Sequence, residues 1–251
     1  MSNYAYKMII AYEGTKYGGW QVQPNAVSIQ SLIEKTLSLI LRQEVDIIGS
    51  GRTDAGVHAL AQVAHFLVHS PIDLNKTLAS LNGILPLDIR ILALAPVAND
   101  FHARYSATSK IYHYHLHLDP VPDPLSRRYT YHVPHPVSPN TLKQAAAQLL
   151  GTHDFTSFAN KAMEAPVKNG IRTLYRLDVV EEAHGVRLEF EGNGFLYKMV
   201  RNIVGTLLDI CAGKIAVDSL PHILAAKDRK SAGRAAPPHG LFLVEVKYAS
   251  E

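Results

Sequence analysis

The amino-acid sequence predicts an α+β protein of two halves, residues 1–105 and 106–251, each built on an antiparallel sheet. Three observations predict this fold. Hydrophobic periods typical of strands and helices alternate along the first half in the order strand, helix, strand, strand, helix, strand. The second half repeats that order loosely. Its first strand alternates apolar and polar residues without interruption, which is typical of a sheet with one buried face.

Local signals define the elements of the first half. Ser28 caps a helix whose apolar residues recur with the 3.6-residue period up to Leu41. A second helix is expected to begin after Asp73 and to end near Leu85, because Pro86 follows. Four strands are expected, at Lys7–Tyr12, Val45–Ile48, Gln62–Val68 and Ile89–Val97. This order is the split-βαβ, or ferredoxin-like, plan, in which two helices cover one face of the sheet.

The second half begins with a strand at Lys110–Leu118, where Tyr112 and Tyr114 share one face. His113, His115 and His117 share the other face. Helices are expected at Pro139–Leu150, Leu196–Ala212 and Ser219–Ala226, and further strands at Thr173–Val180, Val186–Glu191 and Leu241–Tyr248. The proline-rich stretch 119–136 is interpreted as an excursion inside this half rather than a linker.

Composition favours a cytoplasmic globular protein. The chain has 251 residues, of which 47% are hydrophobic and 19% are charged, so a sizeable core is expected. The first residues lack the basic and apolar pattern of a signal peptide, and no apolar run reaches the roughly 18–20 residues that span a bilayer. Cys211 is the single cysteine, which excludes an internal disulfide.

The net charge of +3 is weak support for a polyanionic partner. Residues 1–105 balance 8 basic against 8 acidic side chains, whereas residues 106–251 carry 17 against 14. Two basic clusters lie in that second part: Lys161, Lys168, Arg172 and Arg176, and then Lys227, Arg229, Lys230 and Arg234. Such clusters are more often solvated surface charge than binding sites, so they permit nucleic-acid binding without showing it.

The most unusual stretch is Gly49–Ala59, with the sequence Gly-Ser-Gly-Arg-Thr-Asp-Ala-Gly-Val-His-Ala. Its glycines allow a ligand to approach the backbone closely, and Arg52, Asp54 and His58 supply charge and proton-transfer groups. It is not a phosphate-binding loop of the Walker type, because no Gly-Lys-Ser/Thr follows, and its glycine spacing is not that of a dinucleotide-binding turn. The structural alternative is a tight turn with local aspartate hydrogen bonds.

The stretch Gly51–Ala59 resembles the signature of the tRNA pseudouridine synthase A family, and the resemblance extends over nearly the whole chain. Other segments similar to the family follow in the expected order: Tyr12–Gln21, Leu81–Ile89, Phe101–Ala107, Gly151–Phe158, Gly192–Asn202 and Gly240–Val246. Two departures are mild. Ala61 stands where the family usually has glycine, and Tyr131 stands where tryptophan is more common.

The resemblance implies a mechanism in which Asp54 attacks the target uridine, so that the base detaches, rotates and rejoins the ribose through C5. Whether the carboxylate attacks the ribose or the base stays open. A carboxylate nucleophile must be ionised, and a nearby cation favours that state. By the family's pattern the cation is Arg201, which we expect within about 4 Å of Asp54. The alternative is an exposed arginine on a solvated helix face.

The resemblance also implies substrate-binding residues. Tyr112 matches the tyrosine that lies against the target base, although aromatic residues on one strand face are more often core. Arg52 is the candidate that fills the space of the flipped nucleotide or contacts its phosphate. His113, His115 and His117 project about 7 Å apart along one strand, so we interpret them as a polar surface and expect no metal site.

The resemblance therefore implies an isomerase that converts uridine to pseudouridine in the anticodon stem-loop of tRNA, at positions 38–40. The resemblance further implies a homodimer, a basic catalytic cleft between the two halves, and no metal or small-molecule cofactor. Two alternatives remain at this point. A catalytically inactive RNA-binding module of the same fold would lack the chemistry of Asp54, Tyr112 and Arg201, and a nucleotide-binding protein would need a lysine that the Gly49–Gly56 loop lacks.

Overall fold

The structure, a computed structural model, describes residues 4–160 and 169–249 and divides into two compact units. The first unit comprises Met1–Thr108 with Phe242–Glu251, and the second comprises Ser109–Leu241. The sequence assigned residues 242–251 to the second half. They group with the first unit because strand β10 (Leu241–Tyr248) pairs in parallel with β3 (His58–Val68), at Phe242 with His58 and Leu243 with Ala59.

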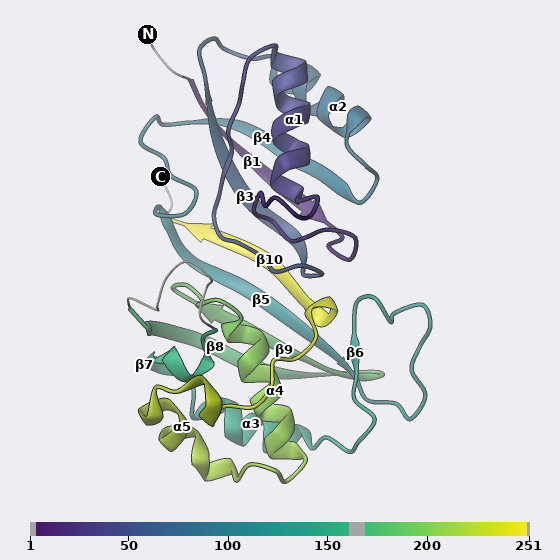
Figure 1. Ribbon diagram of the computed structural model, residues 1–251, viewed down its shortest axis with the longest axis vertical. Helices are drawn as coiled ribbons and strands as arrows, with labels where there is room; N and C mark the ends of the chain where they lie inside the picture. The colour runs from purple at the N-terminus through teal and green to yellow at the C-terminus, as the bar shows by residue number, and fades with distance from the viewer. Residues whose placement is uncertain (1–3, 161–168, 250–251) are drawn as a thin grey trace. The chain divides into compact units, whose positions relative to one another are not determined.

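The first unit follows the split-βαβ order that the sequence predicts (Figure 1). Its elements are β1 (Tyr4–Tyr12), α1 (Ile29–Leu41), β2 (Ile48–Gly49), β3, α2 (Leu74–Ile84) and β4 (Ile89–Val97). Strand β1 pairs antiparallel with β3 on one side and with β4 on the other. Strand β2 pairs with β3 beyond that, so the strand order β4-β1-β3-β2 is the ferredoxin-like one.

The core of the first unit lies on the sheet face that carries Tyr6, Met8 and Ile10, all 5% exposed or less. Helix α1 contributes Ile29, Ile33 and Leu37, which are fully buried and recur at the helical period. The Ser28 side chain accepts from the Ser31 backbone amide, as the sequence predicts for a cap, and Asp73 does the same for α2. Local capping and apolar period together place both helices.

The expected strand at Val45–Ile48 is wrong for its first three residues, since β2 contains only Ile48 and Gly49. Val45 and Ile47 are buried, so their apolar character was interpreted correctly. Their backbone amides bind side chains of α1 and not a neighbouring strand: Val45 donates to Ser38 Oγ at 3.0 Å and Ile47 donates to Glu34 Oε1 at 3.0 Å. Side-chain acceptors thus replace a strand ladder, which sequence patterns do not reveal.

The second unit has a four-stranded antiparallel sheet in the order β5-β9-β8-β7. These four strands are β5 (Ala107–His117), β7 (Gly151–Asp154), β8 (Ile171–Glu182) and β9 (Gly185–Gly192), and the two-residue strand β6 (Tyr131–His132) pairs in parallel with β5. Its helices are α3 (Pro139–Ala147), α4 (Met199–Cys211) and α5 (Leu220–Ala226). The sequence did not predict β6 and β7, which are short. The α+β class with antiparallel sheets is confirmed in both units.

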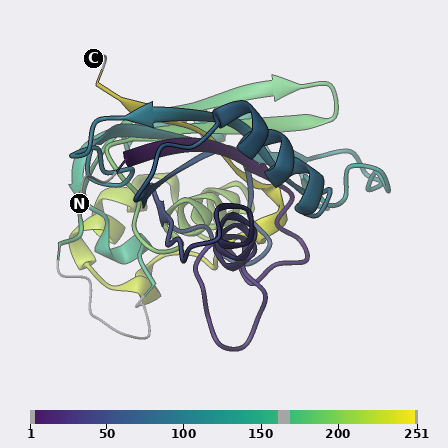
Figure 2. The ribbon, with the colours of Figure 1, turned by 90° about the horizontal axis from the view of Figure 1, so that it is seen from above.

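One face of the second sheet is apolar and the other is charged. Tyr114, Leu188 and Phe190 lie at 0% exposure on the apolar face, and α4 covers it with Ile203 and Leu207, which are equally buried. Figures 1 and 2 show α4 and α5 on the same side of β8 and β9. The alternation predicted along residues 110–118 therefore separates the core from the outer face correctly.

Helix α4 begins at Met199, three residues later than expected, because Lys198 adopts a left-handed backbone conformation with φ 61°. An L residue rarely continues a right-handed helix through such a conformation. No helix in the described ranges is long and apolar enough to cross a membrane.

Candidate functional site

The Gly49–Ala59 stretch contains the turn that connects β2 to β3. Thr53, in the middle of this turn, is hydrogen-bonded to the interior of the first unit. The Thr53 hydroxyl lies 2.7 Å from the buried Tyr12 hydroxyl, and the Thr53 carbonyl accepts from the Trp20 amide at 3.1 Å. The next residue, Asp54, closes the turn by accepting from the Val57 amide at 3.1 Å. The carboxylate of Asp54, on a half-buried residue, therefore extends from backbone bound on both sides.

Two glycines of the neighbouring loop allow it to pack directly on this turn. A Cβ on Gly19, whose φ is 95°, would meet the Thr53 carbonyl oxygen at 2.5 Å. A Cβ on Gly14 would meet the Val57 carbonyl oxygen at 2.0 Å. Neither contact can be relieved by a side-chain rotation, because the atom that is met belongs to the backbone. The two segments that the sequence singled out separately, 12–21 and 51–59, thus form one packed structure.

The two ends of the turn are fixed by buried polar side chains. Ser50 donates to Gln62 Oε1 at 2.7 Å, and Gln62 Nε2 donates to the Gly51 carbonyl at 3.0 Å. At the other end His58 Nδ1 accepts from the Gly14 amide at 3.0 Å, and its ring stacks on Phe242 at 4.7 Å. His58 is 1% exposed, so it acts as a structural residue of the turn and not as a proton donor facing solvent.

Arg52 lies on the exposed side of the same turn, two residues before Asp54. Thr53, the residue between them, points into the unit and is 7% exposed. The turn thus separates an anchoring side chain from two charged ones, which is the arrangement a loop needs to present a carboxylate and a cation on a rigid base.

Removing the Tyr12 hydroxyl tests this anchoring. Tyr12→Phe should lower the free energy of unfolding by about 1–3 kcal/mol, because the buried Thr53 hydroxyl loses its partner. Thr53→Val with Tyr12→Phe should recover part of that loss, since neither buried group then stays unsatisfied. Urea unfolding of the two variants and the wild type measures both effects. Equal stability of Tyr12→Phe and wild type would contradict the anchoring role.

Tyr112 lies on β5 in the second unit, on the core face of the sheet. It is 8% exposed and contacts the edge of Phe195, with ring centroids 5.1 Å apart and planes at 80°. Its neighbour on the same face, Tyr114, is fully buried and donates to the Pro237 carbonyl at 2.7 Å. The two tyrosines therefore differ in their surroundings, because Tyr114 is a core residue whereas Tyr112 lies at the border of the core.

Arg201 lies in the first turn of α4 and is half-buried. Its Nε donates to the Ala236 carbonyl at 2.7 Å, and its own carbonyl accepts from the Ala236 amide at 2.9 Å. The alternative of an exposed arginine on a solvated helix face therefore does not describe this residue, which is half-buried and bound by a second segment of its unit. Pairing of Arg201 with Asp54 would join residues of different units and stays a prediction.

The three histidines of β5 have different surroundings. His113 Nε2 lies 3.7 Å from Glu189 and His115 Nδ1 lies 3.5 Å from Glu182, both on the charged face, and burial lowers the pKa of each imidazole. His117 is 6% exposed and its Nε2 lies 3.0 Å from the Val121 carbonyl. Among residues 4–160 and 169–249, no group of three or more His, Cys, Asp or Glu side chains could hold a metal ion.

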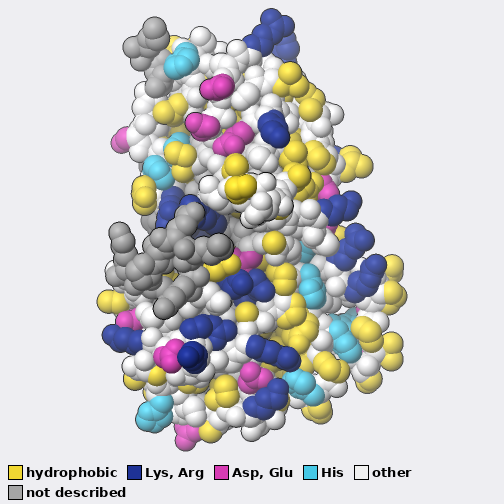
Figure 3. All heavy atoms as spheres, viewed as in Figure 1, with side chains coloured by type: hydrophobic (Ala, Val, Ile, Leu, Met, Phe, Trp, Pro, Cys, Tyr) yellow, Lys and Arg dark blue, Asp and Glu magenta, His cyan; other side chains and the backbone are white. Residues whose placement is uncertain are grey.

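The basic clusters divide into bound and exposed members. Lys161 and Lys168 lie outside the described residues. Arg176 donates to Glu189 at 2.6 Å on the charged sheet face, and Lys227 pairs with Asp154 at 2.9 Å. Arg234 and Lys230 are exposed. Figure 3 shows basic side chains over the second unit with acidic ones among them, so its charge excess is not one uniform surface.

Sequence reasoning missed a buried amide, Asn202, and its partners. Asn202 is 0% exposed, and its Nδ2 donates to the Phe158 carbonyl at 2.6 Å and to Asn160 Oδ1 at 2.9 Å. Its Oδ1 accepts from Arg229 Nη2 at 2.9 Å. No sequence pattern indicated this role, because Asn202 lies beside the apolar stripe of the helix and its partners are 27 to 44 residues away.

The sequence of this chain is similar to those of known proteins over nearly its whole length. A sequence profile of the family described as tRNA pseudouridine synthase matches residues 8–106 and 145–249. The chain is 56% identical to tRNA pseudouridine synthase A 1 of Protochlamydia amoebophila, over 99% of this chain and 98% of that protein. It is 49% identical to tRNA pseudouridine synthase A of Chlamydia muridarum, over 96% and 91%, and 45% identical to that of Acetivibrio thermocellus, over 96% and 98%. Arg52, Asp54 and Arg201 lie in the matched stretches, and Tyr112 lies between them.

Proposed function

Because this chain belongs to the tRNA pseudouridine synthase family, we propose that it isomerises uridine to pseudouridine in the anticodon stem-loop of tRNA, at positions 38–40. Asp54 is the nucleophile. The observation that carries this proposal is the turn at residues 49–59, which supports a carboxylate on backbone bound at Thr53 and Val57. Rigid support of this kind is what a positioned nucleophile requires.

The proposed reaction rearranges bonds within one nucleotide. The C1′–N1 bond breaks, the C1′–C5 bond forms, C5 loses its hydrogen to solvent and N1 gains one. Reactant and product have the same oxidation state, so the overall reaction needs no electron acceptor, and we propose that no cofactor takes part. Asp54 lies in the first unit, whereas Arg201 and Tyr112 lie in the second.

Roles for the other three residues follow the same proposal. Arg201 favours the ionised form of a carboxylate and stabilises negative charge that develops during the reaction. Tyr112 supports the target base through its ring, which suits a position at the border of the core with 8% exposure. Arg52, exposed on the Asp54 turn, contacts the phosphate or fills the space of the flipped nucleotide.

The alternative is a catalytically inactive RNA-binding module of the same fold. Asp54, Tyr112 and Arg201 are all present, which favours the enzyme. Transcribed tRNA with tritium at C5 of every uridine distinguishes the two, because only isomerisation releases tritium to water. Substrates with cytidine at positions 38, 39 and 40 in turn should each lose part of the release. A tRNA that binds without any release would overturn the enzyme in favour of the module.

We also propose that the protein is a homodimer and acts in the cytoplasm, where its tRNA substrate is found. Sedimentation equilibrium of the full chain tests the first part. A mass of twice 27.6 kDa at micromolar concentration supports the dimer, and a mass of 27.6 kDa contradicts it.

Affinity for tRNA should come mostly from phosphate contacts of the second unit's basic residues. The logarithm of affinity should then fall linearly with that of salt concentration, and Arg172→Ala should reduce the slope by about one. Tyr112→Ala is the control, because it removes a base contact and no charge, so it should keep the slope and lower turnover. Filter binding across a salt series measures all three proteins. Lines that are flat in salt would contradict this mode of RNA binding.

A further inference from the structure

Residues 229–236, called here the 229–236 segment, contact α4 between Arg201 and Thr206. At one end Arg229 Nη2 donates to Asn202 Oδ1 at 2.9 Å. In the middle the Gly233 amide donates to the buried Thr206 hydroxyl at 2.9 Å. At the other end the Ala236 amide donates to the Arg201 carbonyl at 2.9 Å. The segment thus contacts one face of α4 through hydrogen bonds at both ends and the middle.

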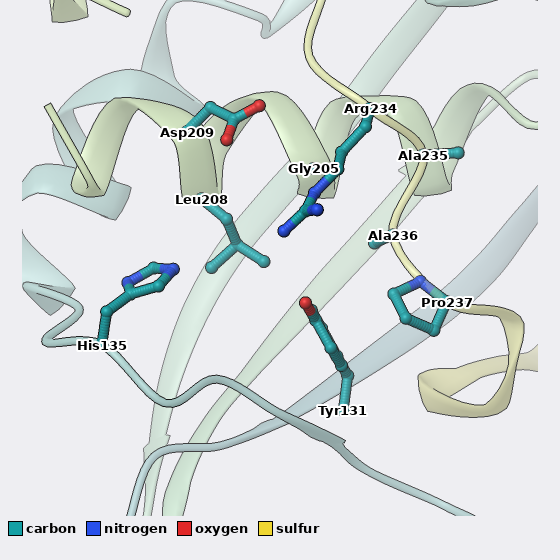
Figure 4. Close-up of a pocket in the computed structure, with 9 residues that line it drawn as sticks. All are labelled: Tyr131, His135, Gly205, Leu208, Asp209, Arg234, Ala235, Ala236 and Pro237. Carbon is teal, nitrogen blue, oxygen red and sulfur yellow. The ribbon is translucent and has the colours of Figure 1, made fainter. Parts of the chain in front are cut away.

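Gly205 makes the close approach of this segment to α4 possible. A Cβ on Gly205 would lie 1.7 Å from the Arg234 carbonyl oxygen and 3.2 Å from the Ala236 amide nitrogen. Figure 4 shows Gly205 on the helix where the backbone of Arg234–Ala236 passes over it. Since the atoms that are met belong to the backbone, any side chain at position 205 must move the whole segment away from α4.

The far end of the segment is bound to the interior of the second unit. Arg229 Nε donates to Asn160 Oδ1 at 3.2 Å, and its Nη1 donates to the Ala232 carbonyl at 3.1 Å. Asn160 in turn accepts from Asn202, which is fully buried in the first turn of α4. The Arg229 guanidinium therefore joins the segment to the start of α4 and to Asn160, which lies two residues after η1 (Phe155–Phe158).

These contacts of the 229–236 segment affect Arg201, which precedes Asn202 on α4. A guanidinium is planar, so a hydrogen bond from Nε fixes the plane of the group and the direction of its two Nη atoms. For Arg201 that bond is the 2.7 Å contact with the Ala236 carbonyl. The Ala236 carbonyl therefore restricts the orientation of the Arg201 fork, and the position of Ala236 depends on how closely the segment packs on Gly205.

We propose that the 229–236 segment orients the Arg201 guanidinium for the reaction, and that Gly205 and Arg229 are positioning residues acting through it. The inference rests on the proposed function, because it takes the role of Arg201 from there. Neither residue needs to touch the substrate.

Gly205→Ala tests the inference, with Gly83→Ala as the matched control, because a Cβ on Gly83 has no atom within 4 Å. Under single-turnover conditions Gly205→Ala should release tritium about 10- to 100-fold more slowly than wild type, since small misplacements of a catalytic group have effects of that size. Its tRNA affinity should fall much less than the rate, because the displaced segment keeps its charged side chains. Gly83→Ala should match the wild type in both measurements.

The same change in an Arg201→Lys background separates positioning from general damage. Lysine has no Nε–H to bind Ala236, so Gly205→Ala should slow that enzyme by no more than about twofold. An equal slowing in both backgrounds overturns the inference while the proposed function survives. A wild-type rate for both Arg201→Lys and Arg201→Ala removes Arg201 from the reaction, and the inference falls with it.

Arg229→Lys keeps the test decisive if Gly205→Ala does not fold. It retains the charge, shifts no backbone by itself, and loses the fork that joins Asn160, Asn202 and Ala232. We expect single turnover to slow by about three- to tenfold, with tRNA affinity close to that of wild type. The thermal midpoint should fall, because the buried Asn202 oxygen loses a donor. A folded Arg229→Lys enzyme with the wild-type rate would overturn the inference.

Discussion

Asp54→Asn is expected to abolish pseudouridine formation, with a loss of at least about 10⁴-fold in the single-turnover rate, the order seen when other enzymes lose their nucleophile. An amide cannot replace a carboxylate as nucleophile, and no second route to the glycosidic bond is available in the proposed mechanism. Folding should be nearly unchanged, because the Val57 amide donates to the backbone carbonyl of Asp54, which asparagine keeps. Tritium release and urea unfolding of the purified variant measure the two effects.

Two controls sharpen this experiment. Asp54→Glu keeps the carboxylate but extends it by one methylene, so a measurable residual rate shows that charge and geometry both matter. Binding of tRNA by Asp54→Asn should match wild type within about threefold, since affinity is expected from phosphate contacts. An Asp54→Asn rate within tenfold of wild type would remove Asp54 from the mechanism.

The sequence predicted the parts of the fold that depend on local signals. Ser28 and Asp73 cap their helices as expected, and the alternation along residues 110–118 assigns the core face of β5 correctly. The errors in the predicted fold occur where contacts with residues distant in the sequence determine the local structure. Val45 and Ile47 bind side chains of α1 and not a strand. The parallel pairing of the last strand, β10, with β3 also joins residues far apart in the sequence.

The candidate site divides in the same way. The glycine-rich turn was recognisable because its unusual residues are adjacent in sequence. The hydrogen bond that anchors the turn could not be predicted, because Tyr12 and Thr53 are 41 residues apart and no sequence pattern in either segment identifies the other as its partner. Arg201 was predicted on a solvated helix face without the resemblance, yet it is half-buried and bound to Ala236, which lies 35 residues further along.

Arg201→Ala is expected to lower the single-turnover rate by about 10²- to 10³-fold, the usual cost of losing one charge-stabilising donor in an active site. The affinity for tRNA should change little in comparison, because one phosphate contact at most is lost. Arg201→Lys should recover part of the rate, since it restores the charge without the planar fork. Rates at saturating enzyme, and tRNA affinities measured separately, distinguish these effects.

A structural defect would also slow Arg201→Ala, because the Nε bond to Ala236 is lost with the side chain. Added guanidinium ion separates the two explanations. If the guanidinium acts on the reaction, the free ion should enter the vacated space and raise the rate of Arg201→Ala in a saturable way. It should do nothing for Asp54→Asn, where the nucleophile itself is absent. Should guanidinium fail to rescue Arg201→Ala while Arg201→Lys is as slow as the alanine variant, the charge of Arg201 plays no part in the chemistry, and its contribution is limited to the contact with Ala236.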